Sequence, residues 1–139
     1  WEFMVDFEAS TSDLCPFVTL ASLNMKKIIR STKHLNFIRS LPCHISEQTP
    51  SQACHIRILS DGGTGLKPSD CFVLPFIYQY HKMQTDLGEQ TFYKKFNINP
   101  FTLAKELVII SPCRKVNNPE VLHLLDIRAK TYARIYQDQ

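Results

Sequence analysis

The segment from Asn24 to Leu41 constrains the fold most, because its apolar residues recur at the spacing of one helix face. The apolar residues on this face are Met25, Ile28, Ile29, Leu35, Ile38 and Leu41. Such spacing is typical of an amphipathic helix that buries one stripe against a core. Asn24 can cap the first turn, and Pro42 disfavours helical geometry in the residue before it. The sequence therefore predicts an internal helix over residues 24–41.

Several other segments have the character of β-strands. In residues 1–8, Trp1, Phe3, Val5 and Phe7 alternate with three acids and Met4, which is the pattern of a strand with one buried face. Further segments rich in β-branched, aromatic or alternating apolar residues cover 15–20, 54–59, 71–80 and 91–96. Pro75 has no N–H to donate, so its strand must lie at an edge or contain a bulge. We predict a mostly antiparallel sheet of about five strands, with polar connections at 42–53, 60–69 and 81–90.

The dipeptide Asn-Pro occurs at 99–100 and again at 118–119. Asn is a favoured N-cap and Pro a favoured first helical residue, so each dipeptide predicts the start of a helix. The first helix runs through Leu103 and Ala104, and the β-branched run 108–110 favours a change to strand before Pro112. The second start predicts a closing helix over about residues 119–136, whose apolar stripe is Val121, Leu125, Tyr132 and Tyr136. The predicted class is α+β, with the sheet packed by the internal and the C-terminal helix.

The length of the chain matches one domain. With 139 residues, of which 44% are hydrophobic and 21% charged, the chain can bury one core. No linker or change of composition marks a second domain. We expect residues 1–139 to form a single globular domain, excised from a larger protein because the sequence begins at Trp1 and not at a methionine.

The apolar runs are too short for a helix that spans a bilayer. A bilayer helix needs about 20 apolar residues, whereas the longest runs cover 72–80 and 107–110. Residues 1–8 carry acids where a secretory signal needs bases. An odd number of widely spaced cysteines favours free thiols over a disulfide framework; they are Cys15, Cys43, Cys54, Cys71 and Cys113. We expect no membrane partner and an intracellular location, in cytoplasm or nucleus.

Two Cys-His pairs, Cys43-His44 and Cys54-His55, contain residue types that bind zinc. Their spacing does not suit a zinc site, because ligands within a pair are normally two to four residues apart, whereas adjacent residues of an extended chain point to opposite faces. Such a site would need Cys71 or His81 to complete it. We favour buried thiols and surface histidines, and we expect no metal and no cofactor.

The sequence contains no motif that assembles a catalytic site. A nucleophile elbow, a Gly-rich phosphate loop, a His-Glu-x-x-His helix and an aspartate-rich loop are all missing from it. We expect no catalytic residues. A thiol-dependent enzyme, with Cys71 or Cys113 as the thiol, or a zinc-dependent module is the third hypothesis.

Basic residues crowd the polar face of the predicted internal helix, and no acid occurs between Leu14 and Ser46. Such a stripe attracts phosphates. Nucleic-acid binding is therefore the alternative function, with these bases on phosphates and an aromatic residue of the second half stacked on a base. The residues of this hypothesis are Lys26, Lys27, Arg30, Lys33, His34, Lys94 and Lys95.

Aromatic residues cluster between Phe76 and Phe96, together with lysines. We expect the phenylalanines of the strand to be buried and its tyrosines, which have a polar tip, to emerge at a partner surface. The leading hypothesis is a non-catalytic interaction domain of a larger intracellular assembly. It would bind a protein partner through the strand edge near Pro75 or through a surface made of Tyr78, Tyr80, Tyr93 and Phe96.

Overall fold

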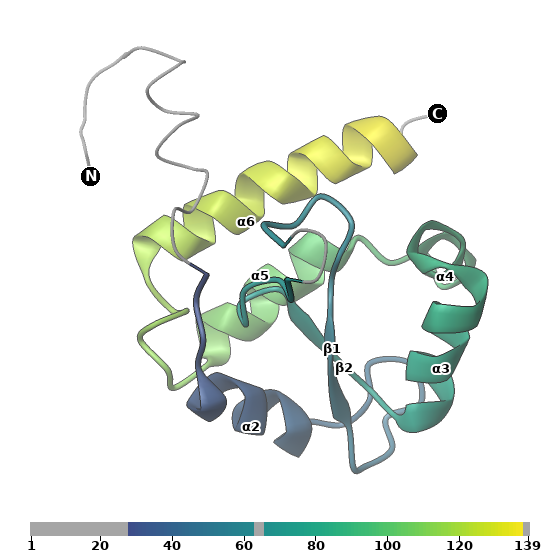
Figure 1. Cartoon of the computed structure of the whole chain (residues 1–139), viewed down its shortest axis with the longest axis horizontal. Coiled ribbons are helices and arrows are strands. Elements are labelled where there is room, and N and C mark those ends of the chain that lie inside the picture. Colours follow the sequence, from purple (N-terminus) through teal and green to yellow (C-terminus); the bar gives the residue numbers. More distant parts are fainter. Residues whose placement is uncertain (1–27, 63–65, 138–139) are drawn as a thin grey trace.

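The computed structural model describes residues 28–62 and 66–137. The elements in chain order are helix α2 (Thr32–Ser40), strands β1 (Gln52–His55) and β2 (Val73–Phe76), and helices α3 (Tyr78–Leu87), α4 (Glu89–Lys95), α5 (Pro100–Ile110) and α6 (Pro119–Tyr132), the last continued by the π-helical turn η1 (Ala133–Gln137). Figure 1 shows the two strands near the centre, with α2 on one side and the pair α3 and α4 on the other. The class is α+β, as predicted.

The predicted sheet of about five strands is wrong. In the described residues the sheet has two strands, β1 and β2, which pair antiparallel with Gln52 opposite Phe76 and His55 opposite Val73. The strands predicted at 1–8 and 15–20 lie outside the described residues. Pro75 pairs with Ala53 in a sheet where each strand forms an edge, which is where a residue without an N–H is tolerated.

The segment after β2 is helical where strand and loop were predicted. The long strand predicted at 71–80 ends at Phe76, the predicted connection at 81–90 contains most of α3, and the predicted strand at 91–96 is α4. Phe92 and Phe96 are four residues apart, so on a helix they share one face, and their rings lie 5.0 Å apart against the core. Burial of that face decides the conformation, because the strand preference of aromatic residues depends on context.

Both Asn-Pro starts are confirmed. Asn99 Oδ1 accepts hydrogen bonds from the N–H groups of Phe101 and Thr102, and Asn118 Oδ1 accepts one from the N–H of Val121. The predicted change to strand at 108–110 is wrong, because α5 continues through Ile110. Val108 is buried where α5 packs on α6 and β2, and this packing overrides its β-branched preference. The C-terminal helix predicted at about 119–136 is present as α6 and η1.

The internal helix is shorter than the predicted 24–41. It begins after Ser31, whose Oγ accepts a hydrogen bond from the His34 N–H, and its predicted cap Asn24 lies outside the described residues. The backbone before the helix is held by the segment before β2, and Ser31 itself is extended. The Ile29 N–H donates to Ser69 Oγ and the Asp70 N–H donates to Ile29 O, both over 2.9 Å. The helix ends before Pro42, as predicted.

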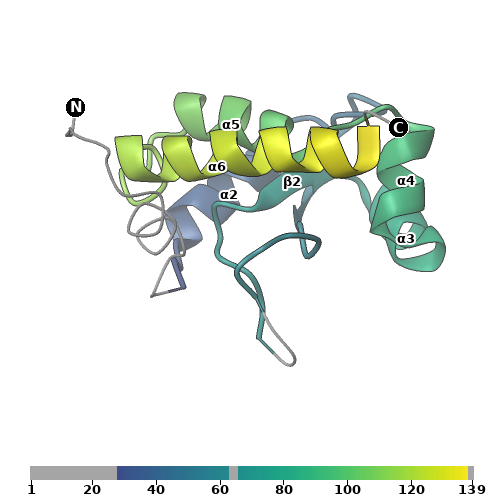
Figure 2. The same cartoon turned by 90° about the horizontal axis from the view of Figure 1, so that it is seen from above.

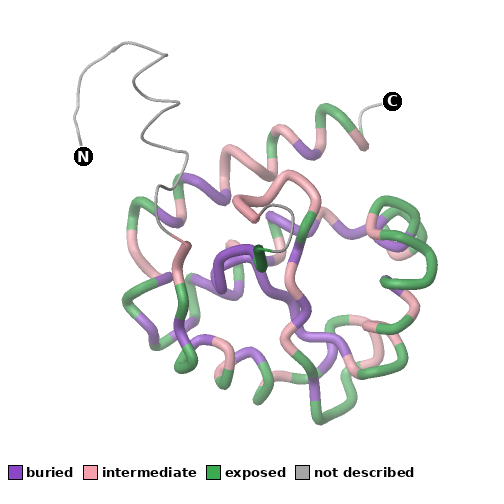
Figure 3. Tube along the Cα trace, viewed as in Figure 1, coloured by how far each residue is buried: buried purple, intermediate pink, exposed green. Residues whose placement is uncertain are grey.

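The core lies between the sheet and the helices that cover it. All residues of β2 are buried, and the purple trace in Figure 3 shows burial concentrated along this strand. Phe72 meets Phe101 of α5 edge to face at 5.8 Å, and Phe76 meets Phe92 of α4 at 5.4 Å. Figure 2 shows α5 and α6 side by side, while the loop from β1 to β2 projects away from them. No helix within the described ranges is long and apolar enough to cross a membrane.

Candidate nucleic-acid interface

A surface pocket of about 420 Å³ lies where the start of α2 meets the loop between α5 and α6. We call it the basic pocket, and its lining residues are Arg30, Ser31, Thr32, Lys33, Cys113, Arg114 and Lys115. In Figure 1 this loop and the start of α2 lie next to each other, although they are far apart in the sequence. Among the described lining residues, most are basic and none is acidic. The pocket therefore suits an anion.

Ser31 connects the two sides of the basic pocket. Its backbone N–H donates to Asp70 Oδ2 over 2.8 Å, and its Oγ lies 2.8 Å from Cys113 Sγ. The same Oγ caps α2 by accepting from the His34 N–H. The start of the helix is thereby fixed against both the segment before β2 and the loop after α5.

The first turn of α2 adds positive potential from the backbone. The N–H groups of Thr32 and Lys33 have no acceptor within a helix, because the first N–H groups of any helix lack one. The N-terminal end of a helix carries a partial positive charge. The first turn of α2 contains no acidic residue, but the buried Asp70 carboxylate accepts from the Ser31 N–H at the N-cap and offsets part of this charge. Anions bind at such helix ends in many proteins.

The four cations of the basic pocket differ in their own contacts. Arg30 donates from its Nη atoms to Pro68 O and Lys67 O, at 2.6 and 2.7 Å, and Lys115 donates from Nζ to Arg30 O at 3.2 Å. These two side chains hold the walls together while keeping their charge. Lys33 and Arg114 are exposed, and neither side chain has a hydrogen bond or ion pair with another described residue. They are the cations best placed to contact a ligand.

Hydrogen bonds, more than the charge of the nearby lysine, set the pKa of the Cys113 thiol. Burial raises the pKa of Cys113, but the hydrogen bond with Ser31, backbone hydrogen bonds at Lys115 and Val116, and the charge of Lys33 outweigh it, so the pKa is lowered overall. The surroundings thus stabilise negative charge at this position.

A buried polar layer lies beneath the pocket. The carboxylate of Asp70 accepts from the Ser31 N–H and lies 2.9 Å from His55 Nε2 and 3.6 Å from Arg30 Nη1. Burial lowers the pKa of His55, and its hydrogen bond with Asp70 opposes this effect. The layer holds the pocket walls in position and takes no direct part in its surface.

The residues of the nucleic-acid hypothesis are only partly brought together. Arg30 and Lys33 line the basic pocket, whereas Lys26 and Lys27 lie outside the described residues. Lys94 and Lys95 are exposed on α4, away from the start of α2 (Figure 1).

His34 does not lie on the exposed face that the sequence predicted. It is fully buried, with Nδ1 at 2.9 Å from Ser111 Oγ, and burial lowers its pKa to about 4, with Asp70 opposing the shift. The helix begins later than predicted and this side chain faces the core, so the neutral ring is no phosphate contact.

In the other half of the basic pocket, sequence reasoning missed Arg114 and Lys115 and named Cys113 only as a candidate thiol. Cys113, Arg114 and Lys115 come from a loop about 80 positions further along the chain. The only signal in the sequence is two adjacent bases after Pro112, which is too common a pattern to identify a site.

The residues of the partner-binding hypothesis do not form one surface. Tyr78 is 65% exposed, but Tyr80 and Phe96 are partly buried against each other with ring centroids 5.6 Å apart. Tyr93 is buried, and its hydroxyl group donates to Glu89 Oε2 at 3.0 Å. The strand edge near Pro75 is covered as well, because Pro75 is buried and its carbonyl accepts from the His44 N–H.

The Cys-His pairs are not assembled into a metal site. Cys43 and Cys54 are buried free thiols, and burial raises the pKa of Cys54 to about 12. His44 is exposed as expected, whereas His55 is largely buried at Asp70. Among residues 28–62 and 66–137, no group of three or more His, Cys, Asp or Glu side chains could hold a metal ion.

Comparison with known proteins gives one match. The sequence model of a family described as a protein of unknown function, DUF968, matches residues 21–108. This range contains the start of α2 and both strands but ends before Cys113. No curated protein and no solved structure matches the chain.

Proposed function

The chain belongs to the DUF968 family, whose function is unknown, and we propose from the geometry of the basic pocket that it binds nucleic acid through the phosphates. The observation that carries the proposal is the convergence of Arg30, Lys33, Arg114 and Lys115 on the N-terminal end of α2. Phosphate contacts from Lys, Arg and helix N-termini supply most of the affinity of non-specific nucleic-acid binding.

The arrangement suits a phosphodiester chain better than a single small anion. The first turn of α2 offers backbone N–H groups for one phosphate. Lys33 and Arg114 come from different segments and are both exposed, so they can reach phosphates on either side of it. The net charge of +3 is too small to attract nucleic acid over the whole surface, which makes this local cluster the decisive feature.

The test is the salt dependence of oligonucleotide binding. Fluorescence anisotropy with a labelled duplex and a labelled single strand is measured over a range of salt concentrations for the wild type and the double variant Lys33→Gln, Arg114→Gln. In a plot of the logarithm of the binding constant against the logarithm of the salt concentration, each phosphate contact contributes a slope of about −0.9 on duplex and −0.7 on single strands. The double variant should therefore lose between one and two units of slope and bind more weakly at every salt concentration.

The matched control is Arg39→Gln, which removes an exposed base from the last turn of the same helix. It should retain most of the affinity. No binding by the wild type at low salt, or an equal loss in the Arg39 control, would overturn the proposal.

A protein partner at Tyr78 is the second candidate. Tyr78 is the first residue of α3 and borders a shallow depression of about 300 Å³ together with Gln52, His81, Lys82 and Thr85. A large exposed aromatic residue beside a depression is a frequent anchor in protein interfaces. Proteins that co-purify with the wild type from cell extract should be lost with Tyr78→Ala but retained with Leu87→Ala, which removes another exposed apolar residue of α3. Retention of every partner by Tyr78→Ala contradicts this candidate.

An intracellular location fits both candidates. The described cysteines Cys43, Cys54, Cys71 and Cys113 are all free and buried, which supports a reducing compartment. Labelling of the protein in intact cells, followed by separation of cytoplasm and nucleus, tests the assignment.

A further inference from the structure

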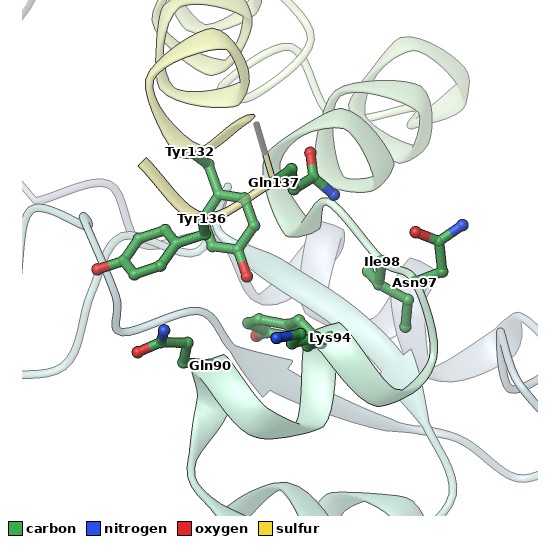
Figure 4. Close-up of a pocket in the computed structure, with 8 residues that line it drawn as sticks. Gln90, Lys94, Asn97, Ile98, Tyr132, Tyr136 and Gln137 are labelled. Carbon is green, nitrogen blue, oxygen red and sulfur yellow. The ribbon is translucent and has the colours of Figure 1, made fainter. Parts of the chain in front are cut away.

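A second cavity, of about 230 Å³, lies between α4 and the end of α6 with η1. Figure 4 shows Gln90 and Lys94 rising from α4 toward Tyr132 and Tyr136, which come from the opposite side. We propose that this tyrosine cavity binds a single nucleobase with its phosphate, from a free nucleotide or from a single strand. Binding of a base from a single strand rests on the proposed nucleic-acid-binding function.

The tyrosines supply an aromatic wall. The rings of Tyr132 and Tyr136 lie with centroids 4.8 Å apart and planes inclined by 38°, and Tyr93 meets Tyr132 edge to face at 6.3 Å. Tyr93 and Tyr132 are buried and fixed, whereas Tyr136 is only partly buried. A planar base can therefore stack on Tyr136, whose position is supported from behind.

Three primary amides, from Gln90, Asn97 and Gln137, border the same cavity. Each amide carries a donor and an acceptor in one plane, which is the chemistry that reads the edge of a base. Gln137 Oε1 already accepts from Asn99 Nδ2 at 3.2 Å, so its position is fixed while its NH₂ group remains a donor. The side chains of Gln90 and Asn97 are exposed and available to a ligand.

Charge and size narrow the ligand class. Among the described residues that line the cavity, Lys94 is the only charged one and none has a carboxylate, so these residues do not favour a cationic ligand or a metal ion. One lysine suits one phosphate. The volume of about 230 Å³ is below the range of pockets that hold drug-sized ligands, which agrees with one base in the cavity.

The π-helical turn forms one wall of the cavity. Tyr136 and Gln137 both belong to η1, and π-helical turns are rare and occur often at functional sites. The basic pocket lies next to the other end of α6, roughly 25 Å away at about 1.5 Å per helical residue. The two sites are therefore separate, and each can be removed without the other.

The test uses adenosine monophosphate and the full chain. In NMR titrations we expect the backbone amide signals of residues 90–98 and 132–137 to shift, and the affinity to fall about tenfold in Tyr136→Leu, which keeps apolar bulk but removes the aromatic face. Tyr80→Leu is the matched control, because it removes another partly buried tyrosine outside both sites. Thermal melting of each variant verifies that it is folded.

Two further arms identify the source of the base. If the source is a single strand, Tyr136→Leu weakens binding of the labelled single strand but not of the duplex; if it is a free nucleotide, only adenosine monophosphate binding weakens. Ribose 5-phosphate, which lacks the base, should shift the signals of the cavity far less. The inference is overturned if Tyr136→Leu changes the affinity for neither adenosine monophosphate nor the single strand, or if ribose 5-phosphate binds as tightly as the nucleotide. The variant Lys33→Gln, Arg114→Gln should still bind adenosine monophosphate, so failure of the proposed function is recognised separately.

Discussion

Ser31 and Cys113 lie 82 positions apart in the sequence, yet Ser31 Oγ and Cys113 Sγ are 2.8 Å apart in the structure. The contact joins the start of α2 to the loop after α5, and both residues line the basic pocket. Ser31 is also the N-cap of α2, since its Oγ accepts from the His34 N–H. The Ser31 hydroxyl group therefore caps α2 and also holds the Cys113 thiol against the start of this helix.

The variant Ser31→Ala, which removes this hydroxyl group, should affect both the stability of the protein and the pKa of Cys113. We expect the free energy of unfolding to fall by about 1 kcal/mol, the usual cost of losing an N-cap side chain. Burial raises the pKa of Cys113 and the hydrogen bond with Ser31 lowers it, so the pKa should rise in the variant. Urea unfolding measures the first effect, and the ultraviolet absorbance of the thiolate as a function of pH measures the second.

Ser40→Ala is the control for this pair of effects. Ser40 lies at the other end of α2, is exposed, and donates from Oγ only to Phe37 O. Its replacement should change the stability by less than about 0.5 kcal/mol and leave the Cys113 titration unchanged. Equal effects of the two alanine variants would contradict the assignment.

The buried His34 should make stability depend on pH. Burial lowers its pKa in the folded protein to about 4, with Asp70 opposing the shift, whereas an unperturbed histidine has a pKa of about 6.5. Between these values the unfolded chain binds more protons, so the free energy of unfolding falls as the pH is lowered from about 6.5 to about 4. The whole difference corresponds to roughly 3 kcal/mol.

Urea unfolding of the wild type and of His34→Gln across this pH range tests the prediction. The variant should be less stable at neutral pH, because the hydrogen bond to Ser111 changes, but its stability should vary less with pH. Burial also lowers the pKa values of His55 and His81, and these residues are present in both proteins. The difference between the two slopes therefore reports on His34, and identical slopes would refute its assigned titration.

Local signals in the sequence were sufficient for the helix ends. Asn99, Asn118 and Pro42 act within one or two turns, and each marks the boundary that the sequence predicted. The start of α2 was mispredicted for a non-local reason. Ile29 and Ser31 bond to Ser69 and Asp70, about 40 positions away, and nothing in the neighbouring sequence indicates those bonds.

The aromatic segment shows the limit of residue preference. Phe92, Tyr93 and Phe96 favour strands on average, yet the first two lie in α4 and Phe96 is its C-cap, because their spacing places them on one buried face of a helix. The same burial explains why Tyr93 is unavailable to a partner. The basic pocket and the tyrosine cavity were not predicted, because each joins segments that are far apart in the sequence. The basic pocket joins the start of α2 to the loop before α6, and the tyrosine cavity joins α4 to the end of α6 with η1.

Gly88 should be difficult to replace, because it joins α3 to α4 with φ of 88° and ψ of 150°. Only glycine adopts this region readily, and other residues lose about 1–3 kcal/mol there. A Cβ atom at this position would meet no atom within 4 Å, so the whole cost comes from the backbone. Gly88→Ala should clearly lower the urea concentration at the midpoint of unfolding. Gln79→Ala, which changes an exposed residue of α3, should not. Unchanged stability of Gly88→Ala would show that the turn can adopt another conformation.

Glu89 should contribute more to stability than an ordinary acid at the start of a helix. Its carboxylate accepts from the Arg57 and Ile58 N–H groups at 3.0–3.1 Å and from the Tyr93 hydroxyl at 3.0 Å, and so it holds the segment after β1 against α4. Hydrogen bonds to a charged group are worth about 1.5–3 kcal/mol. We expect Glu89→Ala to lower the free energy of unfolding by about 2–3 kcal/mol in urea unfolding. Glu120→Ala is the control, because it removes an exposed acid from the first turn of α6, and it should lower the free energy of unfolding by about 0.5 kcal/mol. If both variants lose the same free energy, the hydrogen bonds of Glu89 add nothing to its interaction with the helix dipole.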